Sequence, residues 1–148
     1  MKITEHFKMS ELCHTDTGLD NTPPNHIQQF IRATARILEN VRSIFGRPIY
    51  VNSCYRSPLV NRAVGGSPSS HHLKGTAVDI RVYHLDERSR MSLENALRLY
   101  KPIEFIKYDT FWHVAFDIFH LGHGNKPVST YQQVYPELEE APYTSGDL

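Results

Sequence analysis

The alternation of apolar and polar positions predicts one long helix near the start of the chain. Across residues 20–48, apolar residues recur at spacings of three and four, which is typical of a helix with one buried face. Thr22 is expected to cap this helix, Pro23 to occupy its first turn and Gly46 to end it. The expected buried positions are Ile27, Phe30, Ile31, Thr34, Ile37, Leu38, Val41, Ile44 and Phe45.

Two shorter segments have helical signals of the same kind. Residues 57–66 begin with Ser57 as a cap and Pro58 at the first helical position, and they end in two glycines. Residues 86–100 are amphipathic. The expected core positions of this second segment are Met91, Leu93, Ala96, Leu97 and Tyr100.

Three segments have the pattern of strands. Residues 49–53 form a short apolar run, and residues 103–116 indicate a strand, a turn and a second strand. Between them, β-branched residues alternate with other types over residues 76–82, which places Asp79 mid-strand, on the face opposite Val78 and Ile80. From residue 119 on there is little periodicity. We therefore expect one domain over residues 1–118 and an irregular tail over 119–148.

Composition and charge exclude several classes of function. Lys plus Arg and Asp plus Glu both number 16, and no basic stripe indicates a nucleic-acid partner. No apolar run is long enough to cross a membrane. The opening segment MKITEHFKMSEL lacks the apolar core of a signal peptide, so we expect a protein that is cytoplasmic as synthesised. Cys13 and Cys54 are expected to be free thiols.

The stretch SSHHLKGTAVDI, residues 69–80, contains the first candidate metal-binding residues. His72 precedes Gly75 in a loop or turn, and Asp79 lies in the following strand. A buried carboxylate needs a partner, and a metal ion, an arginine or backbone N–H groups would each serve. His113 lies mid-strand in FWHVAF and by itself would be a core histidine. Together, two imidazoles and one carboxylate would make a three-ligand zinc site with a free fourth position for water.

The motifs around these residues resemble a known family. NSCYRSPLVNRAVGGSPSSHHLKGTAVDI (52–80), followed by WHV (112–114), resembles the zinc D-alanyl-D-alanine carboxypeptidases and dipeptidases. That family also includes phage endolysins that cut the L-alanyl-D-glutamate bond of peptidoglycan. The specific pattern is Ser70-x-His72, then Asp79, then a distant His113 preceded by tryptophan. The segment at residues 7–24 also resembles a small phage or prophage branch, and the resemblance extends over residues 5–117.

This resemblance implies a fold, a cofactor and a partner. The fold would be α+β, with a small antiparallel sheet that carries the zinc and packs against helices. One zinc ion per chain would be bound by His72, Asp79 and His113. Arg56 would bind a substrate carboxylate, and Ser70 would form a hydrogen bond near the metal. The partner would be a peptidoglycan peptide, and we expect a monomer.

Other histidines of the sequence are expected to take no part in this site. His71 is adjacent to His72, but the motif points only to the second of the pair, and His71 is interpreted as solvated. His120 and His123 lie in a glycine-containing segment and are expected to have no function.

One departure from the family concerns the general base. The family commonly has a glutamate a few residues before the last histidine, but positions three, five and six before His113 are Thr110, Tyr108 and Lys107. Asp109, four residues before, is our first choice for the base, and Glu104, nine residues before, is the alternative.

The predicted hairpin places the two carboxylates differently. A tight turn at residues 109–110 pairs Ile106 with His113 and Glu104 with Ala115. Since directly paired residues share a face, Glu104 lies on the same side as His113, whereas Asp109 lies at the tip of the turn. The sequence leaves the choice between them open.

Two functional hypotheses follow. The first is a zinc peptidase that cleaves short D-amino-acid peptides of the bacterial wall, either as a carboxypeptidase or as an endopeptidase. The second is a zinc-stabilised, non-catalytic module that binds a wall peptide or a protein. A protein without a signal peptide would suit either a cytosolic dipeptidase or an endolysin that reaches the wall on phage lysis. A third hypothesis is an α+β domain without a metal.

Overall fold

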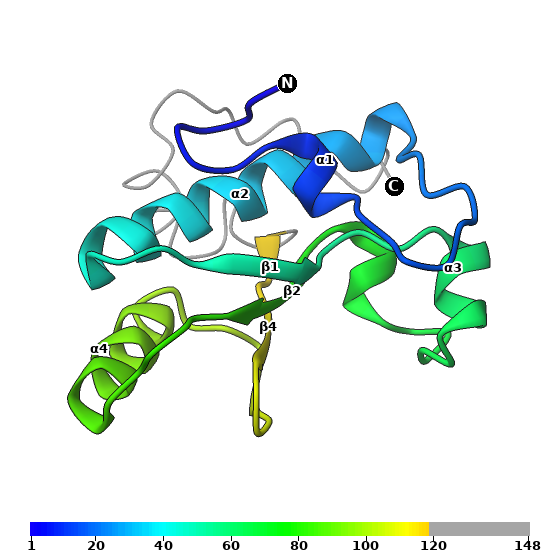
Figure 1. The fold of residues 1–148 in the computed structure, drawn as a ribbon. Helices are drawn as coiled ribbons and strands as arrows, with labels where there is room; N and C mark the ends of the chain where they lie inside the picture. The colour runs from blue at the N-terminus through cyan, green and yellow to red at the C-terminus, as the bar shows by residue number, and fades with distance from the viewer. Residues whose placement is uncertain (119–148) are drawn as a thin grey trace.

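The computed structural model describes residues 1–118, and a four-stranded antiparallel sheet forms their centre (Figure 1). The strands are β1 (Tyr50–Ser53), β2 (Ala77–Arg81), β3 (Glu104–Lys107) and β4 (Trp112–Ala115), in the spatial order β1-β2-β4-β3. The consecutive strands β3 and β4 form a hairpin, and β4 also pairs with β2, so it lies between β3 and β2. The expected α+β class with a small antiparallel sheet is confirmed.

Helices precede, separate and cover these strands. They are α1 (Met9–Leu12), α2 (Asn25–Phe45), α3 (Pro58–Ala63), the 3₁₀ turn η1 (His71–Lys74) and α4 (Glu87–Arg98). The long helix α2 runs along the sheet in Figure 1 and contacts α1, α4 and η1. Neither α1 nor η1 was expected from the sequence, because each is only four residues long and has no room for a periodic pattern.

The predicted apolar face of α2 is confirmed, with differences at its two ends. The helix begins at Asn25 after an extended Pro24. Thr22 does not cap it, because Pro24 occupies the N-cap position; the Thr22 hydroxyl donates to Asp20 at 2.7 Å. Gly46 ends the helix as expected, in the left-handed conformation at φ 83°. Ile44 was expected in the core but is 52% exposed.

The caps of the two shorter helices follow from their sequences. The Ser57 side chain accepts the N–H of Val60 at 3.2 Å, and Pro58 occupies the first turn of α3 as predicted. Asp86 caps α4 in the same way through the N–H of Ser89. Met91 on α4 was expected in the core but is 52% exposed, because the buried face of this short helix is narrower than the apolar pattern.

The sheet has one apolar face and one polar face. Alternate side chains of β2 and β4 enter the hydrophobic core with those of α2; these are Val78, Ile80, Trp112 and Val114. Their neighbours in sequence, Asp79 and His113, lie on the opposite face and are directly paired across the two strands. The alternation of side chains along the two strands therefore places the packing residues on one face and the candidate metal ligands on the other.

The hairpin of β3 and β4 has the register predicted from a tight turn. Ile106 pairs with His113, and Glu104 pairs with Ala115. The N–H of Tyr108 donates to the carbonyl of Phe111 at 2.8 Å and closes the turn. Glu104 consequently lies on the face of the sheet that carries His113.

Cys13 and Cys54 are free thiols, as expected. Burial raises the pKa of Cys13 to about 11 and raises that of Cys54 well above its ordinary value, so both remain protonated at neutral pH. No helix within residues 1–118 has the length and apolar character needed to cross a membrane. The predicted tail, with His120 and His123, lies outside the described residues.

Gly75 links η1 to β2 and is predicted to tolerate no side chain. Its φ is +73°, and a Cβ at this position would lie 2.5 Å from Cγ1 of Ile31. Gly46 is a matched control, since its φ is +83° but a Cβ there would meet nothing within 4 Å. Gly75→Ala should lower the free energy of unfolding by about 1–3 kcal/mol more than Gly46→Ala, because it adds overpacking to the same backbone cost.

Urea unfolding of the two variants measures this difference. Equal losses of stability would show that the close approach of Ile31 to Gly75 has no energetic consequence.

Candidate metal centre

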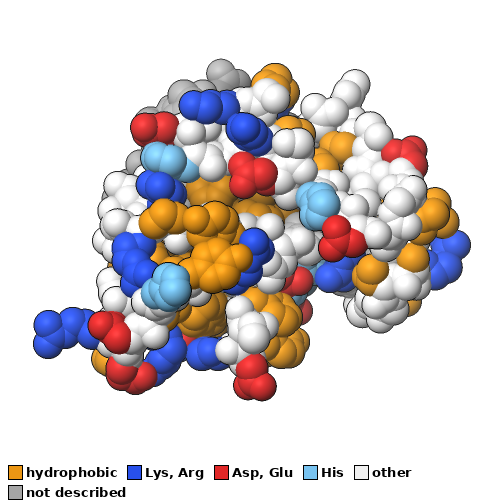
Figure 2. Space-filling view, in the orientation of Figure 1, with side chains coloured by type: hydrophobic (Ala, Val, Ile, Leu, Met, Phe, Trp, Pro, Cys, Tyr) orange, Lys and Arg blue, Asp and Glu red, His pale blue; other side chains and the backbone are white. Residues whose placement is uncertain are grey.

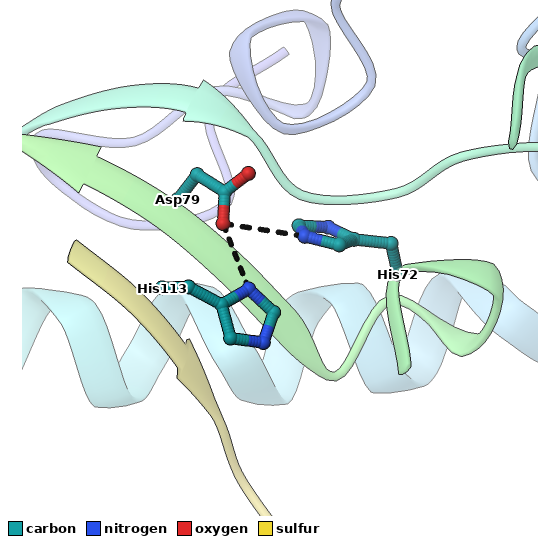
Figure 3. Close-up of side chains that lie close together, drawn as sticks. All are labelled: His72, Asp79 and His113. Atoms are coloured by element: carbon teal, nitrogen blue, oxygen red, sulfur yellow. Dashed lines mark hydrogen bonds and ion pairs between the residues drawn. The ribbon is translucent and has the colours of Figure 1, made fainter. Parts of the chain in front are cut away.

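Two consecutive segments and a third that is distant in sequence bring His72, Asp79 and His113 together (Figure 3). His72 comes from η1, Asp79 from the middle of β2, and His113 from β4 directly opposite Asp79. One ligand atom from each lies within 4.8 Å of the others. Among residues 1–118, this is the group of histidine, cysteine and carboxylate side chains that is close enough to share a metal ion.

His72 is oriented by its own local structure. The Ser70 hydroxyl caps η1 by accepting the N–H of His72 at 3.1 Å. Nδ1 of His72 lies 2.6 Å from the carbonyl oxygen of Cys54, which can only accept, so Nδ1 carries the proton. The other ring nitrogen, Nε2, faces Asp79 at 3.3 Å.

Nε2 of His72 is a buried polar atom without a hydrogen-bond partner. A buried nitrogen of this kind is costly unless something occupies its lone pair. A metal ion is such a partner, and neutral imidazole is a common zinc ligand. The orphaned nitrogen is thus direct support for a metal at this position.

His113 is placed between two carboxylates. Its Nδ1 lies 2.9 Å from Oδ1 of Asp79, and its Nε2 lies 2.7 Å from Oε1 of Glu104. Figure 3 shows the first nitrogen directed at Asp79 and the second directed away from it. Arg56 approaches the other oxygen of Asp79, with Nη2 at 3.7 Å from Oδ2.

The close contacts within the cluster shift the pKa values of Asp79 and His113. Burial acts to raise the pKa of Asp79, but its close contacts with His113 and His72 outweigh burial and hold that pKa well below its usual range. The hydrogen bond to Asp79 raises the pKa of His113 against the effect of burial, and Glu104 adds to the rise. Asp79 is therefore an anion that is ready to bind a cation.

These donors fit zinc. Two imidazole nitrogens and one carboxylate oxygen are a ligand set of catalytic zinc sites, which keep a fourth position open. The cluster opens into a pocket of about 460 Å³. Besides the three cluster residues, the pocket is lined by Arg56, Ser67, Ser70, Glu104, Tyr108 and Phe111.

Comparison with known proteins agrees with this site. Residues 5–115 match the family model described as Peptidase M15. The chain belongs to the Peptidase M15 family. M15 proteins are metallopeptidases that use zinc, and the matched residues contain all three candidate ligands. No curated protein sequence matches the chain.

The structure brings most of the other predicted site residues of this M15 chain to the pocket. Arg56 and Ser70 both line it, and Ser70 also caps the turn that carries His72. His71, the neighbour of His72, is not part of the cluster, as the motif indicated.

Asp109, the first choice for the general base, is not brought to the metal pocket. It lines a separate hollow together with Arg81, Lys107 and Trp112. Glu104, the alternative, lines the metal pocket and contacts His113. The predicted register already placed Glu104 on the face of His113 and Asp109 at the tip of the turn. The hydrogen bond from His72 to the Cys54 carbonyl had no signal in the sequence.

The metal assignment predicts the behaviour of two histidine variants. His113→Ala should remove stoichiometric zinc because it deletes one of three ligands. His71→Ala is the matched control, since this side chain lies next to a ligand but outside the cluster, and it should retain one zinc per chain.

Metal analysis of the purified variants after dialysis gives the readout. Full zinc content in His113→Ala, or its loss in His71→Ala, would contradict the ligand set.

Proposed function

We propose that this chain is a zinc-dependent peptidase that cleaves short D-amino-acid peptides of bacterial peptidoglycan. The observation that carries the proposal is the unpartnered Nε2 of His72, which lies with Asp79 and His113 in an open pocket. Zinc bound there would activate a water molecule for attack on a peptide carbonyl. Membership of the M15 family supports the substrate class.

In this proposal, Arg56 orients a substrate carboxylate. Its Nη1 donates to Oδ1 of Asn61 at 3.2 Å, and its Nη2 lies near Asp79, so two contacts hold the guanidinium at the pocket wall. Gly66 allows this arrangement, because a Cβ there would lie 2.9 Å from Nη1 of Arg56. A guanidinium held in this way can bind a carboxylate through two parallel hydrogen bonds.

The pocket lining also offers an apolar surface. Tyr108 and Phe111 stack with their ring centroids 4.6 Å apart and an interplanar angle of 15°. Tyr108 is 45% exposed and both rings line the pocket, so the stacked pair offers it a flat aromatic surface. We propose that this face contacts the small apolar side chains, such as alanine methyl groups, of a wall peptide.

The carboxylates near the pocket favour a second candidate function. Among the described residues, the pocket contains only Glu104 as a carboxylate besides Asp79, and Oε1 of Glu104 is already bonded to His113. A site without a free proton acceptor would suit the alternative hypothesis, a zinc-stabilised module that binds a wall peptide without cleaving it.

Incubation of the zinc-loaded full-length chain with purified muropeptides separates these functions. The peptidase proposal predicts metal-dependent products, which mass spectrometry would identify as released D-alanine or as peptides cut between L-alanine and D-glutamate. Tight binding without products would favour the non-catalytic module, and neither binding nor products would overturn both. Cleavage at the second bond would also support the phage endolysin branch.

Arg56 provides a prediction about substrate use. Arg56→Ala should keep one zinc per chain but lower kcat/KM on wall peptides by about tenfold or more, the effect of losing one charge-assisted hydrogen bond of about 1.5–3 kcal/mol. Arg56→Lys should also be impaired, because a point charge does not reproduce a two-pronged contact. Wild-type kinetics in both variants would remove Arg56 from the substrate site.

Asp109 provides a prediction about proton transfer. A positioned general base contributes roughly 10²–10⁴-fold in rate. Because Asp109 lines a hollow separate from the metal pocket, Asp109→Ala should lower kcat far less than that. Steady-state kinetics of the zinc-saturated variant provide the test, and a loss of two or more orders of magnitude would restore Asp109 as the base.

A further inference from the structure

Glu104 reaches His113 across the hairpin rather than along the chain. Its direct partner in the register is Ala115, and His113 is opposite Ile106, so Glu104 and His113 are diagonal neighbours on one face. Diagonal Cα atoms are roughly 7–8 Å apart, a gap that only a long side chain spans. Oε1 of Glu104 closes it and lies 2.7 Å from Nε2 of His113.

The two nitrogens of the His113 ring have different surroundings. Nδ1 is directed into the cluster toward Asp79, and Nε2 is directed out of it toward Glu104 (Figure 3). An oxygen bonded to Nε2 therefore lies on the side of the imidazole away from an ion on Nδ1. This position is suited to orienting the ring and poorly suited to contacting a reacting atom beside the ion.

His72 has the same arrangement with a different acceptor. Its outer nitrogen, Nδ1, donates to the backbone carbonyl of Cys54, and its inner nitrogen faces Asp79. Each histidine thus presents one nitrogen to the cluster and the other to an oxygen. The acceptor for His72 belongs to the backbone, but the acceptor for His113 is a side chain that substitution can remove.

We propose that Glu104 is a positioning residue for the metal site and not its general base. It accepts the Nε2–H of His113, which leaves the lone pair of Nδ1 for the ion and holds the ring in the plane that the cluster requires. The inference rests on the metal site of the proposed function, but it holds for a catalytic and for a non-catalytic zinc protein alike.

The geometry predicts an order among substitutions at position 104. Glutamine has the length of glutamate and keeps an accepting oxygen, but it cannot take a proton. Aspartate keeps the charge but is one methylene too short for the diagonal reach. Alanine loses both. The side chain of Glu104 is 41% exposed, so none of these changes opens a core cavity.

Zinc affinity, measured by competition with a chromophoric chelator, tests this order. Glu104→Ala and Glu104→Asp should bind zinc about 10–100-fold more weakly than wild type, which is the usual cost of losing such an outer carboxylate. Glu104→Gln should bind zinc as wild type does. Glu87→Ala, which removes an exposed carboxylate outside the pocket, is the control for charge and should have no effect.

Two further measurements separate positioning from proton transfer. In wild type and Glu104→Gln loaded with zinc, NMR should show a slowly exchanging Nε2–H of His113, and in Glu104→Ala this signal should be lost. Zinc-saturated Glu104→Gln should keep wild-type kcat, whereas loss of a base would lower kcat by about 10²–10⁴-fold.

The outcomes for Glu104 and for the peptidase proposal are distinct. Wild-type zinc affinity in Glu104→Ala would overturn the positioning role, and so would a kcat collapse in Glu104→Gln with its zinc affinity intact. A chain that binds zinc, loses affinity in Glu104→Ala and cleaves no wall peptide would uphold the positioning role while the peptidase proposal fails. A wild-type chain that binds no zinc would overturn both.

Discussion

The pairing of β2 with β4 places Asp79 directly opposite His113, and the candidate site depends on that register. A slip of either strand by one residue would turn its site residue, Asp79 or His113, to the other face of the sheet and move its valine, Val78 or Val114, out of the core. The apolar residues that pack against α2 therefore also determine where the candidate metal ligands lie. The alternation of side chains along β2 and β4 thus determines both the packing of the core and the position of the candidate site.

The cluster is costly unless its polar atoms are satisfied. A buried carboxylate and two largely buried imidazoles would destabilise an apolar interior. Outer acceptors reduce this cost, with the Cys54 carbonyl on His72 and Glu104 on His113. One buried nitrogen, Nε2 of His72, is left without a hydrogen-bond partner, and a metal ion is the partner that its surroundings fit. The charged side chains on the face in view in Figure 2 are of both signs and intermingled.

The local sequence pattern was sufficient to predict much of the fold and part of the candidate site. The helix spacing of α2, the cap of α3 and the hairpin register all depend on neighbouring residues, and each was predicted from sequence. The exposure of Ile44 and Met91 was not, because the width of a buried face is determined by the elements that pack on it. The sequence also could not decide which of Asp109 and Glu104 lies at the metal pocket. Residue spacing predicts the face of the sheet that a residue occupies, but not how far or in which direction its side chain extends. The Cys54 carbonyl is a long-range backbone contact and has no sequence signature.

X-ray absorption at the zinc edge of the loaded chain tests the metal centre most directly. The account predicts a first shell of only nitrogen and oxygen at about 2.0–2.1 Å, with outer scattering from two imidazoles. In this account His72, Asp79 and His113 would supply that shell, and the protonated thiols Cys13 and Cys54 would stay outside it. A sulfur ligand at about 2.3 Å, or scattering from fewer than two imidazoles, would contradict the account.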